Sequence, residues 1–377
     1  MRIAFNATAL LSPLTGIGQY AFELAQRLAA DSAHDAEFFY GLAWSREVRT
    51  TPLPGARTLF GMARRFVPNS YAVSRYLQGR KFTQAARRFD VYHEPNFLAY
   101  RFDGPLVLTV HDLSWIRFPQ AHPAERVAAM NRYFEPSLRR AAVVLTDSAF
   151  VKQEVIDVFG IDPQRILPIG LGVSPLFRPL PADATAPLMA RQGLAHGSYL
   201  LAVGTLEPRK NLVTALRAYA ALPEASQCAY PLVLAGIKGW HNEDLDAQLQ
   251  PLIASGRVRL TGYLSREDLA ALIAGATALV YPSIYEGFGL PPLEAMACGV
   301  PTIVSNVASL PEVVGDTGLL IEPYDHEGLR DAMQRLIDSP RLRADLGAQA
   351  LRRAASFTWD SCARQTVAAY GRAIAQA

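Results

Sequence analysis

Strand-like and helix-like segments alternate along the whole of this 377-residue chain. Short apolar runs, such as 105–110, 143–146 and 278–281, are separated by longer segments with helical periodicity. The alternation is typical of α/β proteins with parallel sheets, because each crossover between parallel strands needs a long connection such as a helix. We therefore predict an α/β fold.

A stretch rich in proline and glycine, residues 170–187, separates two such series of segments. The length also suits two domains, since domains usually have roughly 100–200 residues. We predict an N-terminal Rossmann-like domain at 1–175 and a C-terminal Rossmann-like domain at 176–357. Two similar halves joined by a linker are expected to place a ligand cleft between them.

The most informative local stretch is 283–299, which follows a predicted strand and leads into a predicted short helix. Pro291 and Pro292 fit only the first turn of that helix, where missing N–H groups cost nothing. Gly287 and Gly289 leave the preceding loop nearly bare, so a ligand can approach the backbone. The free N–H groups of a helix start favour an anion such as phosphate.

Two carboxylates bracket this loop, Glu286 before the turn and Glu294 inside the helix. Carboxylates are poor phosphate ligands, but they accept hydrogen bonds from sugar hydroxyls. The stretch therefore predicts a site for a sugar joined to a phosphate.

A second loop, 204–211, also lies between a predicted strand and a predicted helix and contains Arg209 and Lys210. Cations gain nothing from the dipole of a helix start. Their presence is explained if a diphosphate binds between them and the backbone amides. The alternative is a surface turn with two solvated bases.

His111 and Asp112 follow the predicted strand 105–110, and the carboxyl ends of such strands face the ligand crevice. Asp112 is a candidate to orient His111 or to stabilise its charge, although neighbours on a strand point to opposite faces. The alternative is a structural histidine. Neither residue has metal-ligand spacing with another His or Cys, so no zinc site is expected.

The segment Thr15-Gly16-Ile17-Gly18 formally matches the start of a dinucleotide-binding fingerprint. About nine residues separate the preceding strand from Gly16, which is too long for that turn. A glycine loop at the mouth of the cleft, opening a helix, fits this spacing better than a nicotinamide site.

Residues 48–89 contain no Asp or Glu but carry nine Arg and Lys residues among aromatic ones. This pattern indicates an anionic membrane surface or nucleic acid, or alternatively a solvated helix face over core aromatics. The net charge of the chain is only +3 and no nucleic-acid-binding motif occurs, which argues against nucleic acid.

Cys228, Cys298 and Cys362 have neither disulfide-framework nor metal-like spacing, which favours a reducing compartment. The first residues lack the apolar core and cleavage site of a signal peptide. No run of about 18 apolar residues occurs either. We expect a cytoplasmic protein, with peripheral association at the inner face of the membrane as a further hypothesis.

Together the glycine loop, the basic loop and the segment from Glu286 to Glu294 resemble glycosyltransferase family 4, retaining enzymes of the GT-B fold. The resemblance covers essentially the whole chain and is strongest over 199–324. It implies two Rossmann-like domains whose parallel sheets face each other across a cleft. It also implies that the final helix, within 358–377, crosses back to the N-terminal domain.

The resemblance implies a role for each matching position. Glu294 would hold the ribose hydroxyls and Glu286 the hydroxyls of the donor sugar. Arg209 and Lys210 would bind the diphosphate and stabilise charge on the departing nucleotide, while His111 would lie beside the transferred sugar. The remaining donor-binding positions implied are Gly16, Gly18, Gly204, Thr205, Gly262, Tyr263, Leu264, Phe288, Gly289 and Leu290.

The sequence at 207–211, Glu-Pro-Arg-Lys-Asn, is similar to bacterial mannosyltransferases of polysaccharide and O-antigen assembly. One departure is Gly204-Thr205, where many members carry Gly-Arg, and Arg209 would supply the missing charge. We predict metal-independent transfer of mannose from GDP-mannose to a saccharide or lipid-linked saccharide. The alternatives are a UDP-sugar transferase, a sugar-nucleotide isomerase or phosphorylase, and a non-catalytic nucleotide-sugar sensor.

Overall fold

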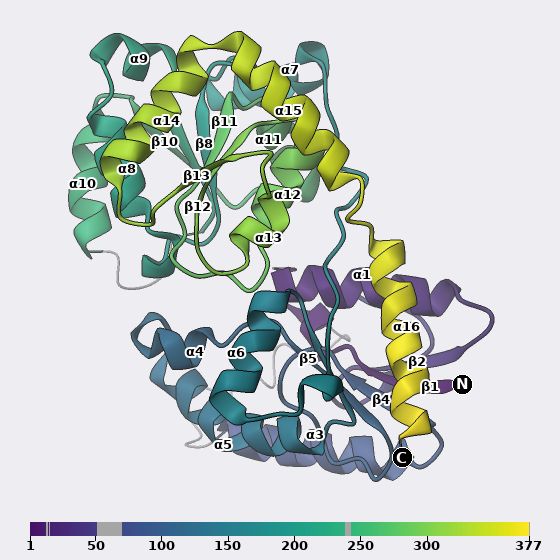
Figure 1. Ribbon diagram of the computed structural model, residues 1–377. Helices are drawn as coiled ribbons and strands as arrows, with labels where there is room; N and C mark the ends of the chain where they lie inside the picture. Colours follow the sequence, from purple (N-terminus) through teal and green to yellow (C-terminus); the bar gives the residue numbers. More distant parts are fainter. Residues whose placement is uncertain (13, 15, 51–69, 238–242, 377) are drawn as a thin grey trace. The chain divides into compact units, whose positions relative to one another are not determined.

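The computed structural model describes residues 1–12, 14, 16–50, 70–237 and 243–376. The chain forms two compact units (Figure 1). Unit 1 comprises Met1–Leu113, Ala124–Leu171 and Trp359–Ala377, and unit 2 comprises Ser114–Pro123 and Gly172–Thr358. The predicted domain 1–175 differs from unit 1 chiefly at 114–123, which the structure groups with unit 2.

Unit 1 contains a seven-stranded sheet of order β3-β2-β1-β4-β5-β6-β7. All neighbouring strands are parallel except β2 and β3, which are antiparallel. The strands are β1 (Arg2–Asn6), β2 (Asp35–Phe39), β3 (Trp44–Ser45), β4 (Val91–Glu94), β5 (Leu106–Val110), β6 (Val143–Thr146) and β7 (Ile166–Pro168). The helices are α1 (Gly16–Ala30), α3 (Ser70–Ala86), α5 (Ala124–Arg140), α6 (Ala149–Phe159), α16 (Trp359–Ala375) and the 3-10 helices Thr8–Leu11 and Pro163–Arg165.

The C-terminal helix α16 belongs to unit 1 and runs beside α1, as Figure 1 shows. It also packs on β4, β5 and β6. Its Tyr370 hydroxyl lies 2.7 Å from Nδ1 of the buried His93, and Asp360 binds Arg27 of α1 at 2.6 Å. The end of the chain is therefore part of the core of the unit in which the chain begins.

Unit 2 contains a six-stranded, fully parallel sheet of order β10-β9-β8-β11-β12-β13. The strands are β8 (Leu200–Val203), β9 (Leu232–Ala235), β10 (Val258–Gly262), β11 (Ala278–Tyr281), β12 (Thr302–Ser305) and β13 (Leu319–Ile321). The helices are α4 (Ser114–Arg117), α7 (Ala182–Gln192), α8 (Leu212–Ala220), α9 (Glu224–Ala229), α10 (Glu243–Ala254), α11 (Arg266–Ala274), α12 (Leu290–Ala297), α13 (Leu310–Val314), α14 (His326–Asp338), α15 (Pro340–Ala354) and the 3-10 helices Pro119–Ala121 and Pro208–Lys210.

The strands are short apolar runs because both faces of a parallel sheet are covered by helices. β5, β6, β9 and β11 are buried along their whole length. In each sheet the parallel strands end at one common edge, and the loops that leave this edge carry the candidate site residues. The predicted α/β fold with parallel sheets in two domains is thus confirmed.

Several local predictions hold. Ser148 caps α6, its Oγ accepting a hydrogen bond from the Val151 amide, and Gly160 ends that helix with φ 61°. Pro291 and Pro292 lie in the first turn of α12. The predicted linker 170–187 is too long, however, because α7 begins at Ala182 and contains Pro187.

Other local predictions have different outcomes. The short edge strands β3 and β13 were not predicted, since two or three residues carry no periodicity. The expected helix at 71–88 is α3. The expected helix at 58–66 lies outside the described residues.

Candidate functional site

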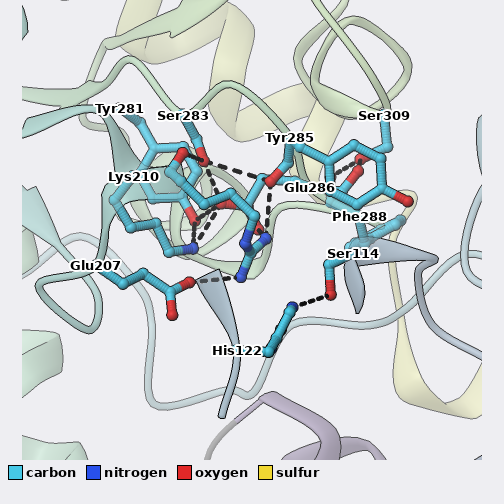
Figure 2. Close-up of polar contacts among 11 residues, drawn as sticks. Ser114, His122, Glu207, Lys210, Tyr281, Ser283, Tyr285, Glu286, Phe288 and Ser309 are labelled. Carbon is cyan, nitrogen blue, oxygen red and sulfur yellow. Dashed lines mark hydrogen bonds and ion pairs between the residues drawn. The ribbon is translucent and has the colours of Figure 1, made fainter. Parts of the chain in front are cut away.

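A buried carboxylate, Glu286, is the centre of a polar cluster in unit 2 (Figure 2). Its Oε1 accepts hydrogen bonds from Lys210 Nζ at 2.5 Å, Ser283 Oγ at 2.6 Å and the Tyr281 hydroxyl at 2.8 Å. Its Oε2 accepts from Arg209 Nη1 at 3.2 Å. The donors come from the end of β11 and from the loop between β8 and α8, which leave the same edge of the sheet.

Two opposing effects determine the ionisation of Glu286. Burial by itself raises the pKa of the carboxyl. The charges of Lys210 and Arg209, with hydrogen bonds from Lys210 and Ser283, outweigh burial and lower this pKa to about 2. Glu286 is therefore a fixed anion at any physiological pH.

Arg209 is held by a second buried carboxylate. Its Nη2 donates to Glu207 Oε1 at 2.7 Å, and its Nη1 also donates to the Tyr285 carbonyl at 2.7 Å. Two cations and two carboxylates thus compensate one another in formal charge. An arriving dianion can replace the carboxylate partners of Arg209 and Lys210. The two cations have already lost much of their hydration on folding, so binding does not add that desolvation cost.

The loop from Gly204 to Lys210 lies against the end of β9 through glycine. Gly204 has φ 142° and Gly236 has φ 155°. A Cβ on Gly236 would lie 1.9 Å from the Gly204 carbonyl oxygen. This close approach places the loop, with half-buried Thr205, at the carboxyl edge. Glycine is therefore required by packing at Gly236 and favoured by its φ at Gly204, whatever the loop binds.

The start of α12 is fixed by Ser309. Its Oγ lies 2.9 Å from the Glu286 carbonyl oxygen and 2.7 Å from that of Phe288. Gly289 has φ 116°, a conformation that favours glycine. Leu290 is the first residue of α12, so the loop turns directly into the helix.

Glu294, one turn into α12, is buried and binds Arg266 of α11, with Arg266 Nη1 3.1 Å from Glu294 Oε1. Burial raises the pKa of Glu294 to about 7, although Arg266 acts against this shift. Of the other predicted residues of this region, Gly262 is the last residue of β10, and Tyr263 and Leu264 lie between β10 and α11. The ring of Tyr263 is exposed.

His111 lies at the carboxyl edge of the sheet of unit 1. Its Nδ1 is 2.8 Å from Asp147 Oδ2, and its Nε2 is 2.8 Å from the Pro95 carbonyl oxygen. Both partners accept, so the ring can hold a proton on each nitrogen. Burial lowers the pKa of His111, but the Asp147 charge and hydrogen bond reverse this and raise it.

The orienting residue of His111 is therefore Asp147 and not the predicted Asp112. β5 and β6 are parallel with Val110 opposite Thr146, so His111 and Asp147 follow on adjacent strands. The sequence signal that could have found Asp147 is its position, directly after a predicted strand as His111 is.

The glycine loop lies in the same unit. Gly16 opens α1, and a Cβ on Gly18 would lie 3.2 Å from Leu14 Cδ2. Thr15 lies outside the described residues. Gly16, Gly18 and His111 belong to unit 1, and all other predicted site residues belong to unit 2.

Sequence reasoning missed several partners in unit 2. Arg266 is far from Glu294 along the chain, and no local pattern identifies it as a partner. Ser309 begins a segment, 309–313, that continues the family motif, but the contacts of its hydroxyl with Glu286 and Phe288 were not predicted. The segment Ser114–Pro123 was also missed. His122 Nε2 lies 2.9 Å from Ser114 Oγ (Figure 2), and the centres of the Phe118 and Tyr285 rings are 5.5 Å apart.

Over the described residues, no group of three His, Cys, Asp or Glu side chains is placed to hold a metal ion. Metal independence itself stays a prediction. Likewise, none of the helices in the described part of the chain is both long enough and apolar enough to span a membrane.

Two family descriptions match this chain. "Glycosyltransferase Family 4" matches residues 14–175, and "Glycosyl transferases group 1" matches residues 191–353. The O-antigen chain mannosyltransferase B of Escherichia coli is 37% identical over 380 residues, which cover 98% of this chain and 99% of that protein.

Solved structures share the fold. Sucrose-phosphate synthase from Thermosynechococcus elongatus superposes with a TM-score of 0.74 at 23% identity, covering 100% of both chains. Anabaena Alr3699/HepE in complex with UDP-glucose has a TM-score of 0.71 at 20% identity, covering 97% of this chain and 98% of that one. The two family descriptions and the full-length match to this relative, together with the two parallel-sheet units, show that the chain is a glycosyltransferase and belongs to glycosyltransferase family 4.

Proposed function

We propose that the protein transfers mannose from GDP-mannose to a saccharide or lipid-linked saccharide acceptor, with retention of anomeric configuration, in the assembly of cell-surface polysaccharide or lipopolysaccharide. The observation that carries this proposal is the Glu286 cluster, in which two cations and an ionised carboxylate meet at the carboxyl edge of the sheet. The similarity to an O-antigen mannosyltransferase along the full chain supports mannose as the sugar.

The chemistry assigned to unit 2 follows from these charges. Breaking a sugar–phosphate bond leaves negative charge on the diphosphate, which Arg209 and Lys210 stabilise. Cations that are already in place before the reaction lower its barrier most, because nothing must reorganise as charge develops. Glu286, released from them, accepts hydroxyls of the donor sugar, and Glu294 accepts those of the ribose. The amides of Phe288, Gly289 and Leu290 complete the donor site.

Gly16, Gly18 and His111 are assigned to the same reaction from unit 1. The pair of acceptors around His111 favours its protonated form, which cannot act as a general base. We therefore assign His111 a hydrogen-bonding role beside the transferred sugar. In a retaining transfer on one face, the departing phosphate takes the proton of the acceptor hydroxyl.

The test is turnover with an acceptor lysate fraction or synthetic lipid-linked saccharide, comparing GDP-mannose with UDP-glucose and UDP-galactose. We expect product only with GDP-mannose and an α-linked sugar, read from the anomeric carbon–proton coupling by NMR. Binding of GDP and UDP measured by calorimetry supports the assay. If neither nucleotide binds better than inorganic phosphate, the proposal is wrong.

A UDP-sugar transferase is the second candidate, because Alr3699/HepE shares the fold and was crystallised with UDP-glucose. Turnover with a UDP-sugar alone would replace the GDP-mannose proposal by this one. An epimerised donor, or a product that depends on free phosphate, would favour an isomerase or phosphorylase. Addition of EDTA tests the predicted metal independence, and activity is expected to remain unchanged.

We further propose a cytoplasmic protein that associates peripherally with anionic membrane through α3. The exposed face of this helix combines Val73 and Tyr76, 53% and 63% exposed, with Leu77, Arg80 and Lys81. Apolar side chains next to cations suit the headgroup region of an anionic bilayer. Flotation with phosphatidylglycerol vesicles at low and high salt tests this, and no salt-sensitive binding would contradict it.

A further inference from the structure

Glu294 differs from Glu286 in how it is held. Glu286 has four side-chain donors, whereas Arg266 is the one hydrogen-bonding partner of the Glu294 side chain among the described residues. Glu294 is 5% exposed. The orientation and charge of this carboxylate therefore depend on a single side chain of another helix.

Arg266 is itself held in place. Its guanidinium carbon lies 4.8 Å from the centre of the Phe177 ring, and Phe177 is buried. Arg266 is also the first residue of α11, where the helix dipole disfavours a cation. Helix stability therefore does not explain an arginine at this position, whereas contact with Glu294 does.

We infer that Arg266 is a positioning residue for Glu294, keeping it as an oriented carboxylate that accepts two hydrogen bonds from the ribose diol of the donor. This inference rests on the proposed function, since it deepens the role given to Glu294. Sequence motifs do not mark Arg266, which is 28 positions before Glu294.

The electrostatics support the geometry. Burial favours the neutral acid, in which one oxygen becomes a donor and the other accepts more weakly than a carboxylate oxygen, so the two hydroxyls of a diol are held less strongly. Arg266 acts in the opposite direction, toward the ionised form. Replacing Arg266 by an apolar side chain should remove both the orientation and the charge, and hence the preference for a 2′-hydroxyl.

The experiment combines a protein change with a ligand change. GDP and 2′-deoxy-GDP are titrated into the wild type, Arg266→Met and Arg266→Lys by calorimetry, with UDP and 2′-deoxy-UDP as a second arm so that the base does not matter. Arg191→Met is the matched control, because Arg191 of α7 forms an ion pair at 2.6 Å with Asp268 of α11, the helix that also carries Arg266. Thermal melting confirms that each variant is folded.

We expect the wild type and Arg191→Met to prefer the ribonucleotide about tenfold, the size of one hydrogen bond to a charged acceptor. In Arg266→Met the ribonucleotide should bind about tenfold more weakly and the preference should approach one, while Arg266→Lys should restore part of it. In turnover, Arg266→Met should raise KM for the donor more than it lowers kcat.

Several outcomes would overturn the inference. An unchanged ribose preference in folded Arg266→Met would leave Arg266 as a link between α11 and α12, with the proposed function intact. Tighter binding by that variant would mean that Arg266 competes with the ribose. Absence of nucleotide binding by the wild type in both arms would remove the inference and the proposed donor together. If Arg266→Met does not fold, the test rests on the ratio of ribonucleotide to 2′-deoxyribonucleotide affinity in Arg266→Lys. A ratio and an affinity equal to those of the wild type would then count against the inference.

Discussion

Replacing Glu286 by glutamine tests whether Lys210 and Arg209 hold this carboxyl ionised. The folded pKa is about 2, and that of an unfolded glutamate is about 4.3. Because the folded pKa is depressed, the group stabilises the fold above the unfolded pKa, and this stabilisation is lost as the pH falls toward 2. At neutral pH it amounts to roughly 3 kcal/mol.

Glu286→Gln lacks this contribution and also leaves two half-buried cations less compensated, so it should be destabilised at pH 7 by roughly 3 kcal/mol or more. At pH 3 part of the wild-type contribution is already gone. The free-energy gap between wild type and variant should therefore narrow by roughly 2 kcal/mol between pH 7 and pH 3.

The assay is calorimetric melting of both proteins at pH 7, 5 and 3, with the transition of unit 2 compared between them. A change of roughly 2 kcal/mol corresponds to about 4–8 °C in Tm for a domain of this size. Glu267→Gln, an exposed glutamate of α11, serves as the control and should follow the wild type at every pH. A gap between Glu286→Gln and wild type that stays constant from pH 7 to pH 3 would refute the reasoning.

Three further changes test other parts of the site. Gly289→Ala, at φ 116°, should destabilise the protein by about 1–3 kcal/mol, while Gly371→Ala, with open space around it, should not; thermal melting of the two variants decides this. Asp147→Asn should lower the pKa of His111, because the charge and hydrogen bond of Asp147 are the largest effects that oppose burial; imidazole NMR titration showing an unchanged value would contradict this. Lys210→Met should weaken nucleotide binding at least tenfold, and calorimetric titration giving wild-type affinity would exclude a diphosphate contact.

Much of the secondary structure could be predicted from local sequence. Buried strands such as β5 and β11 are apolar runs of four or five residues, and Ser148 and Gly160 mark both ends of α6. These features depend on neighbours in the chain, so they can be read without a structure. β3, β13 and α7 were missed, because short edge strands have no period and a proline inside a helix resembles a break.

The sequence alone also determined which loops carry the candidate site. Glycine, proline and charged residues directly after predicted strands identified 204–211 and 286–294, since parallel strands deliver the loops at their carboxyl ends to one edge. The sequence could not determine how the charges in these loops pair. Pairing depends on strand order, and strand order is a property of the folded sheet.

Only the tertiary structure therefore decided the partners. Glu286 meets Lys210 and Arg209 because β8 and β11 are neighbours in the sheet. His111 is oriented by Asp147, and not by Asp112, because β5 and β6 are neighbours in the other sheet. Arg266 meets Glu294 through the packing of α11 on α12. Side chains far apart in sequence acquire their charge states from one another only when folding removes water from between them, and residue spacing along the chain does not contain that information.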